Sequence, residues 1–212
     1  AWMVLFSLFR FILVVATWSL HGDATPGLLL GSFAHGLLFD LSMGVKVVAP
    51  FALWRIWRPT PARIERRLAL VLFGVVAFIC IFALTAAVAF YKEFQVRLGP
   101  LALEYFGKPE DNKIVLGMIW HGYPVVRWML VCIAIWALFV WLGKKLLVMP
   151  TDSAGWLARL LATLILAAVT VIGSRGGFRE SPLRWGDAIF SQNTYANHMA
   201  QNGVFSLIDT VR

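Results

Sequence analysis

The stretch LALVLFGVVAFICIFALTAAVAF, Leu68 to Phe90, is apolar throughout apart from Thr85. A helix rises about 1.5 Å per residue, so roughly 20 apolar residues in succession cross the hydrocarbon core of a bilayer. This run carries no charged side chain and is long enough to span that core. It predicts a transmembrane helix and places the chain among the all-α integral membrane proteins.

The composition agrees with this class. Of 212 residues, 60% are hydrophobic and 14% are charged, which is outside the range of soluble domains. The formal net charge is +8, but the basic residues lie between apolar runs rather than along one polar face. We interpret them as a topology signal and predict no nucleic-acid partner. The two cysteines, Cys80 and Cys132, lie inside apolar runs and form neither a disulfide framework nor a zinc spacing.

Four further apolar runs flank the first one, so the sequence predicts five spans. They cover approximately residues 1–20, 28–57, 68–90, 123–142 and 156–172. The run at 1–20 has no basic lead and no small-residue cleavage site, so we expect a span with residues before it and not a signal peptide. Between the third and fourth spans, apolar residues at helical spacing predict short interfacial helices, broken at Gly99-Pro100.

The charges of the loops predict an orientation. The turn at 21–27 has no Lys or Arg, whereas the loop after the second span is rich in arginine, with Arg55, Arg58, Arg63, Arg66 and Arg67. Lys144 and Lys145 follow the fourth span. Positive loops face the cytoplasm, so the N-terminus is predicted to be cytoplasmic and residues 174–212 extracytoplasmic.

Residues 174–212 are too polar to span a membrane, yet they do not resemble a free linker. Ser181-Pro182 indicates a helix start and Asn202-Gly203 a helix stop. Apolar residues recur between and beyond these signals, at Ile189, Phe190, Tyr195, Met199, Phe205 and Ile208. A linker that swings freely lacks such contacts. We interpret residues 174–212 as a connector of short helices docked on the outer face of a five-span domain at 1–173.

Asp40 most needs an explanation, because an ionised carboxylate within a bilayer costs several kcal/mol unless it is paired. Arg10 and Asp40 each lie about ten to twelve residues from the turn at 21–27, or roughly 15–18 Å along their helices. They are therefore predicted to meet at one depth as an intramembrane ion pair. The pair either holds spans one and two together or serves a polar cavity. Lys46 is expected to extend toward the inner end of its span.

Basic residues also gather at the predicted outer surface, where anionic headgroups collect. The candidates are Arg97, Arg127, Arg175 and Arg184. Arg127 at the start of its span also fits a side chain that extends to the headgroups without a specific site. The four histidines lie in different segments without metal-ligand spacing, and no phosphate-binding glycine loop or nucleophile motif is found. We predict no catalytic residue and no metal site in this chain.

Several stretches together resemble a known family. They are GLLFDLS at residues 36–42, FYKEFQVRLGPLALEY at 90–105, IWHGYP at 119–124 and SRGGFRESPLRWGDAIFSQNTYANHMAQNGVFSL at 174–207. In these the chain resembles the N-terminal transmembrane domain of lipoteichoic acid synthase-like phosphoglycerol transferases, members of the sulfatase and alkaline phosphatase superfamily. The resemblance includes the five spans and the outward C-terminus.

The resemblance implies an enzyme of the bacterial plasma (inner) membrane. In that family an extracytoplasmic domain follows, with a threonine nucleophile and a divalent metal, usually manganese. It transfers glycerol phosphate from phosphatidylglycerol to a hydroxyl of a glycolipid, polymer or glucan. The expected partners are membrane lipids and that domain, and residues 1–212 are expected to be inactive alone. Arg97, Arg127, Arg175 and Arg184 would then hold the donor headgroup or orient the domain.

Two other interpretations stay open. The same module could belong to a phosphoethanolamine transferase or another lipid-using member of the sulfatase superfamily, because the donor headgroup is recognised outside these residues. The chain could also be a non-enzymatic transporter or scaffold subunit, since buried charges such as Arg10 and Asp40 often mark transport pathways.

Overall fold

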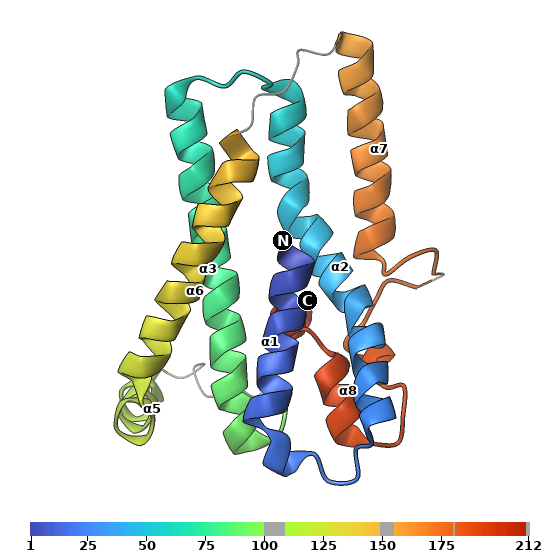
Figure 1. Ribbon diagram of the computed structural model, residues 1–212. Coiled ribbons are helices and arrows are strands. Elements are labelled where there is room, and N and C mark those ends of the chain that lie inside the picture. The colour runs from blue at the N-terminus through green and yellow to red at the C-terminus, as the bar shows by residue number, and fades with distance from the viewer. Residues whose placement is uncertain (100–108, 149–154, 180, 211–212) are drawn as a thin grey trace.

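The computed structural model describes residues 1–99, 109–148, 155–179 and 181–210, and every regular element within them is a helix (Figure 1). Four helices are long and apolar enough to cross a membrane. They are α2 (Pro26–Trp57), α3 (Arg63–Phe94), α6 (Val125–Val148) and α7 (Trp156–Ser174). The prediction of an all-helical, multi-pass membrane protein is confirmed at this level.

The first predicted span forms a shorter helix. Helix α1 (Trp2–Ala16) has 15 residues, followed by a single 3-10 turn, η1 (Trp18–Leu20). At 1.5 Å per residue, α1 is about 22 Å long, which is less than the hydrocarbon thickness. Helix α1 is therefore apolar but too short to count as a span by itself, and the fifth span stays a prediction.

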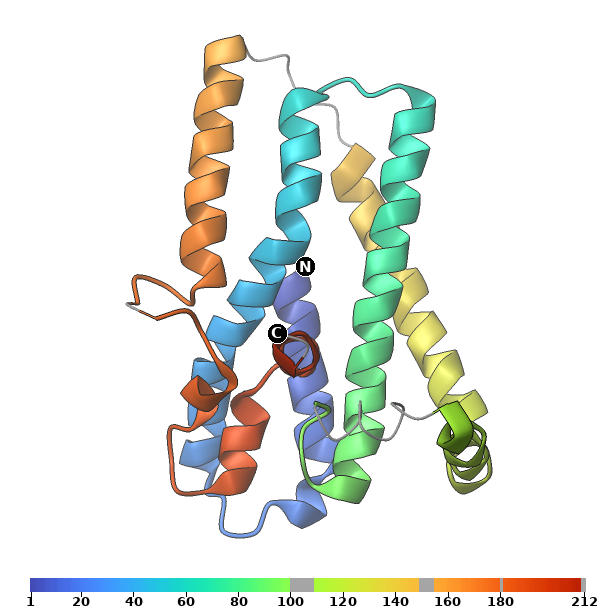
Figure 2. The ribbon, with the colours of Figure 1, turned by 180° about the vertical axis from the view of Figure 1, so that it is seen from behind.

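Long helices that are far apart in the sequence pack against each other in pairs. Helix α3 packs against α6 and α2 packs against α7, while α1 contacts both α2 and α3 between them (Figures 1 and 2). We call the end with the Arg58–Ala62 loop the arginine end. The opposite end, with the His21–Thr25 turn and the C-terminus of α3, is the connector end. α6 and α7 thus lie on opposite sides of the bundle.

Local chemistry fixes the ends of α2. Thr25 Oγ1 accepts a hydrogen bond from the Leu28 amide at 3.3 Å, and Pro26 occupies the first helical position. Pro50 lies inside the helix, where its ring displaces the carbonyl of Lys46 and removes one backbone hydrogen bond. The helix bends part-way along its length (Figure 1).

Helix α3 is longer than the apolar run that predicts it. Glu65 accepts a hydrogen bond from the Ala62 amide at 3.1 Å and starts the helix, and Gln95 ends it in the left-handed conformation. Helix α5 (Pro109–Gly122) lies across the bundle axis at the connector end (Figures 1 and 2), as a helix on a membrane surface does. Part of the predicted interfacial segment, including Pro100 of the Gly99-Pro100 break, lies outside the described residues.

The C-terminal connector enters the bundle. It contains η2 (Trp185–Ala188), α8 (Thr194–Ala200) and α9 (Gly203–Thr210). Helix α7 ends half-way along α2, where Ser42 Oγ donates a hydrogen bond to the Ser174 carbonyl at 2.9 Å. Beyond that level, α8 packs against α2 and α1 in the space that α7 does not reach (Figure 2).

Two expectations about the connector need correction. The Ser181-Pro182 signal does not start a helix, because the first helical turn forms only at Trp185, where Asp187 accepts the Arg184 amide at 2.8 Å. Asn202-Gly203 does mark the end of α8, but it also starts α9. Asn202 Oδ1 accepts the amides of Val204 and Phe205 at 2.9 and 3.2 Å.

The close approach of α6 to α3 depends on Gly143. A Cβ atom at this position would lie 2.4 Å from Phe73 Cε1. The Phe73 ring is held by Phe139, Phe51 and Trp2, with ring centroids 5.7–6.1 Å away, so it has little room to move.

We therefore expect Gly143→Ala to lower the free energy of unfolding by about 1–3 kcal/mol, because overpacking outweighs the gain in helix propensity. Gly117→Ala is the matched control, since nothing lies within 4 Å of its added Cβ. Thermal unfolding of both variants in the same detergent measures the difference. Equal melting temperatures would contradict the packing argument.

Candidate functional site at the docked connector

The centre of the site is a buried ion pair between α1 and α2. Arg10 Nη1 donates to Asp40 Oδ2 at 2.8 Å, and Arg10 Nη2 donates to Asp40 Oδ1 at 2.9 Å. The two side chains are 2% and 0% exposed. This bidentate geometry is the strongest arrangement available to a guanidinium and a carboxylate. The two residues that the sequence predicts to meet at one depth are in direct contact.

The connector supplies the remaining partners of the pair. Asn202 Nδ2 donates to Asp40 Oδ1 at 2.8 Å, and Arg10 Nε donates to the Met199 carbonyl at 2.9 Å. Ser7 Oγ lies 3.4 Å from Asp40 Oδ2 and adds a weaker contact. The pair therefore joins three parts of the chain: α1, α2 and the end of α8 with the turn that follows it.

Gly36 provides the space for the Arg10 side chain. A Cβ atom at this position would lie 2.2 Å from Arg10 Cζ and 2.4 Å from Nη2. The absence of a side chain at this position therefore lets the Arg10 guanidinium approach the backbone of α2 closely.

A second arginine binds the end of α8. Arg97 Nε donates to the His198 carbonyl at 2.7 Å, and its Nη2 donates to the Gln201 carbonyl. Carbonyls at a helix C-terminus have no partner within the helix and carry partial negative charge, which a guanidinium complements. Burial lowers the pKa of Arg97 to about 10, and the nearby Arg10 charge lowers it further in the same direction. Arg97 therefore stays charged at neutral pH.

His198 lies between this arginine and α3. Its Nδ1 is 3.2 Å from Tyr91 Oη, and the two rings meet edge to face at 5.6 Å. Burial lowers the pKa of His198, and the Arg97 charge lowers it as well. Both effects favour the neutral imidazole.

Further contacts fix the rest of the connector. Tyr195 Oη and Thr17 Oγ1, both buried, lie 2.9 Å apart. Asn197 holds the preceding loop, because its Oδ1 accepts the amides of Phe190 and Ser191 at 3.2 and 3.1 Å. His35 of α2 stacks on Phe190 with ring centroids 4.4 Å apart. Side chains of α1, α2 and α3 thus all contribute to the docking.

The other predicted basic residues do not join this cluster. Arg175 is half-buried at the end of α7 and donates to the Arg179 carbonyl at 3.2 Å. Arg184 is exposed just before η2, and Arg127 is exposed near the start of α6. Because α6 and α7 lie on opposite sides of the bundle, Arg127 is separated from Arg175. The structure thus places the four arginines in different surroundings, and Arg97 binds the end of α8.

The chemistry of this site is binding of charged and backbone groups. Within the described ranges, no group of three or more His, Cys, Asp or Glu side chains is arranged to hold a metal ion. Sequence reasoning finds Arg10, Asp40 and Arg97 but assigns Asn202 only to a helix stop. It misses the carbonyl partners on Met199, His198 and Gln201 because a backbone oxygen has no residue signature.

Comparison of the chain with protein-family models, with curated proteins and with solved structures finds no match. The function is therefore inferred from the geometry of the site and from the residues that carry the resemblance.

Removing the acid of the central pair tests the role of the cluster. Asp40→Asn leaves the Arg10 charge buried without its counter-ion, and we expect it to lower the free energy of unfolding by about 3–5 kcal/mol. The connector should also become sensitive to limited chymotrypsin digestion at Phe190 and Tyr195, which is measured by mass spectrometry of the fragments.

Two matched variants serve as controls. Ser7→Ala removes only the long contact to the same carboxylate and should cost about 1 kcal/mol or less. The double variant Arg10→Met/Asp40→Asn leaves no unpaired charge and should cost less than Asp40→Asn alone. Connector protection equal to that of the unmodified protein in Asp40→Asn would show that the pair does not hold the connector.

The state of His198 predicts a pH dependence. Its pKa lies below the usual value when α8 is docked, so the undocked segment binds a proton first as the pH falls. Docking is therefore strongest above about pH 6.5 and weakens as the pH falls toward the lowered pKa. Hydrogen exchange of the α8 amides at pH 7.5 and 5.5 measures this change. His198→Asn should remove it, and an unchanged pH dependence in that variant would assign the effect to another group.

Proposed function

We propose that this chain is the membrane module of a lipid-using phosphoglycerol transferase, which holds an extracytoplasmic catalytic domain at the headgroups of phosphatidylglycerol. The resemblance in residues 36–42, 90–105, 119–124 and 174–207 supports the family. The observation that carries the proposed role is the docking of the connector by Arg10, Asp40, Asn202 and Arg97.

A phospholipid presents its scissile phosphate at the headgroup level, so a soluble catalytic domain acts on it only when held close to that plane. A displacement of about 1 Å between the reacting groups reduces the rate of reaction by about a hundredfold. A connector fixed by buried, charge-assisted hydrogen bonds limits such displacement more than a flexible linker does. Docking therefore suits a chain that must aim an attached enzyme at a membrane.

The proposal includes the orientation of the helix bundle in the membrane. The arginines of the 55–67 region favour a cytoplasmic arginine end, which makes the connector end extracytoplasmic in a plasma membrane. Arg97 acts by positioning the connector. Arg175 and Arg184, which flank the loop between α7 and η2, contact the donor headgroup or the catalytic domain. Arg127 binds headgroups on the other side of the bundle. The divalent metal, manganese by resemblance, belongs to the catalytic domain.

A phosphoethanolamine transferase is the alternative within the same superfamily, and the choice of donor separates the two. A transporter gains no support from the Arg10–Asp40 pair, because the pair is enclosed by α1, α2 and the connector and is 2% and 0% exposed. A charge that serves a transport pathway must meet water or the transported ion.

The test uses the full-length protein in vesicles that contain phosphatidylglycerol and phosphatidylethanolamine. Diacylglycerol released from each donor is separated by thin-layer chromatography. We expect release from phosphatidylglycerol, and we expect Arg97→Gln to reduce it by about tenfold or more because the connector is no longer fixed.

Arg63→Gln, an exposed arginine at the opposite end of the bundle, is the matched control and should keep its turnover. Release from phosphatidylethanolamine alone would favour the alternative enzyme. No release from either lipid would refute the transferase proposal. Equal turnover in Arg97→Gln and Arg63→Gln would refute the positioning role of Arg97.

A further inference from the structure

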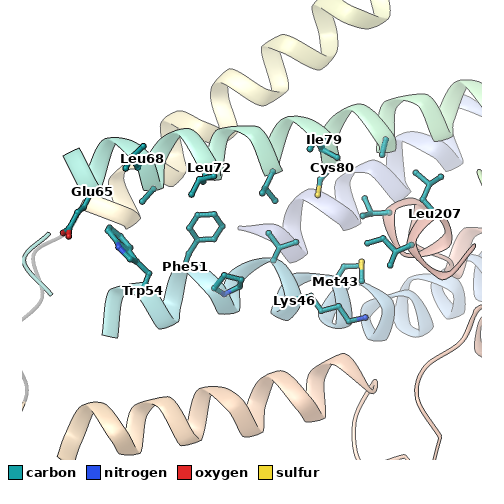
Figure 3. A pocket seen from close by; sticks show the side chains of 17 residues that line it. Met43, Lys46, Phe51, Trp54, Glu65, Leu68, Leu72, Ile79, Cys80 and Leu207 are labelled. Atoms are coloured by element: carbon teal, nitrogen blue, oxygen red, sulfur yellow. The ribbon is translucent and has the colours of Figure 1, made fainter. Parts of the chain in front are cut away.

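A long apolar groove runs between α2 and α3 and ends at α9 (Figure 3). Its volume is about 1130 Å³. On α3 the lining extends from Glu65 to Ala83, which corresponds to about 27 Å along the helix. Leu72 and Ile79 at its rim are 59% and 60% exposed, so the groove opens through an apolar edge. In a membrane, such an edge faces lipid hydrocarbon.

Charge is distributed unevenly along this groove. Among its described lining residues, the charged ones are Lys46 and Glu65. Glu65 lies at the arginine end, with its Oε1 3.6 Å from Arg58 Nη1. Lys46 points toward α9 (Figure 3), with Nζ 5.5 Å from the centre of the Phe205 ring. The expectation that Lys46 extends toward the arginine end is therefore wrong, and the positively charged residue among the described lining residues lies near the connector.

Lys46 lies near the level at which α7 ends. Helix α7 ends at Ser174, which is hydrogen-bonded to Ser42 of α2. Lys46 lies four residues from Ser42, or about 6 Å along α2, so its side chain reaches toward the level where that span ends. An anion beside Lys46 would thus lie near the C-terminal end of α7, while its apolar part extends along the groove.

We propose that this groove binds one anionic glycerophospholipid, with its phosphate beside Lys46 and α9 and an acyl chain along α2 and α3 toward the arginine end. The apolar walls match an acyl chain, and the Lys46 ammonium complements the charge of the phosphate. The inference concerns a lipid held by the membrane helices and does not depend on the transferase activity.

Two neighbouring valines allow a matched test. Val76 lines the groove, whereas Val75 is 51% exposed on α3 and does not line it. The protein is purified from vesicles with equal amounts of phosphatidylglycerol and phosphatidylcholine of the same chains, and bound lipid is measured by native mass spectrometry. We expect one retained lipid, mainly phosphatidylglycerol, for the unmodified protein and for Val75→Trp. We expect Val76→Trp to lose it.

Lys46→Gln tests the headgroup contact separately and keeps the inference falsifiable if Val76→Trp fails to fold. It should lower the ratio of bound phosphatidylglycerol to phosphatidylcholine by about fivefold, the effect of one partly exposed ion pair. Equal lipid retention in Val76→Trp and Val75→Trp would overturn the site. An unchanged lipid ratio in Lys46→Gln would overturn the proposed orientation. Because the readout is bound lipid, failure of the transferase assay leaves this result intact.

Discussion

The structure depends on one buried guanidinium–carboxylate pair and on the groups that complete it. Removing Arg10 and Asp40 from water carries a desolvation cost that their mutual attraction offsets only with good geometry and further hydrogen bonds. The Met199 carbonyl and the Asn202 amide supply those hydrogen bonds from the connector. Closure of α1 on α2 and docking of the C-terminal segment are therefore coupled, because each satisfies polar groups that the other leaves exposed.

Helix α7 is shifted along the bundle axis relative to α2, and this shift leaves space in which the connector packs. Because α7 ends at the level of Ser42, the N-terminal half of α2 has a free side, and α8 fills it. A polar segment in this position is surrounded by apolar helices, so its carbonyls need donors from the protein. Arg97 serves the carbonyls of His198 and Gln201, and Arg10 serves that of Met199. The two guanidiniums together bind the end of α8 and the turn that follows it.

The proposed functions share this end of the molecule. A docked connector holds an attached domain in a defined position, and α9, part of the same connector, closes the groove that contains Lys46. A lipid in that groove would contact the segment that positions the enzyme. Docking of the connector and occupation of the groove are then expected to influence each other through α9 without a further binding site.

The long helices and the shared depth of Arg10 and Asp40 can be predicted from the sequence alone. Apolar runs of about 20 residues predict α2, α3, α6 and α7, since a helix in a bilayer must satisfy its own backbone. Counting residues from the turn at 21–27 places Arg10 and Asp40 at one depth, because the rise per residue is constant. Three contacts are seen only in the tertiary structure: Gly36 makes room for Arg10, Lys46 points toward α9, and Arg97 binds backbone carbonyls. These choices depend on helix rotation, on the offset of α7 and on backbone oxygens, which every residue has and no residue type marks.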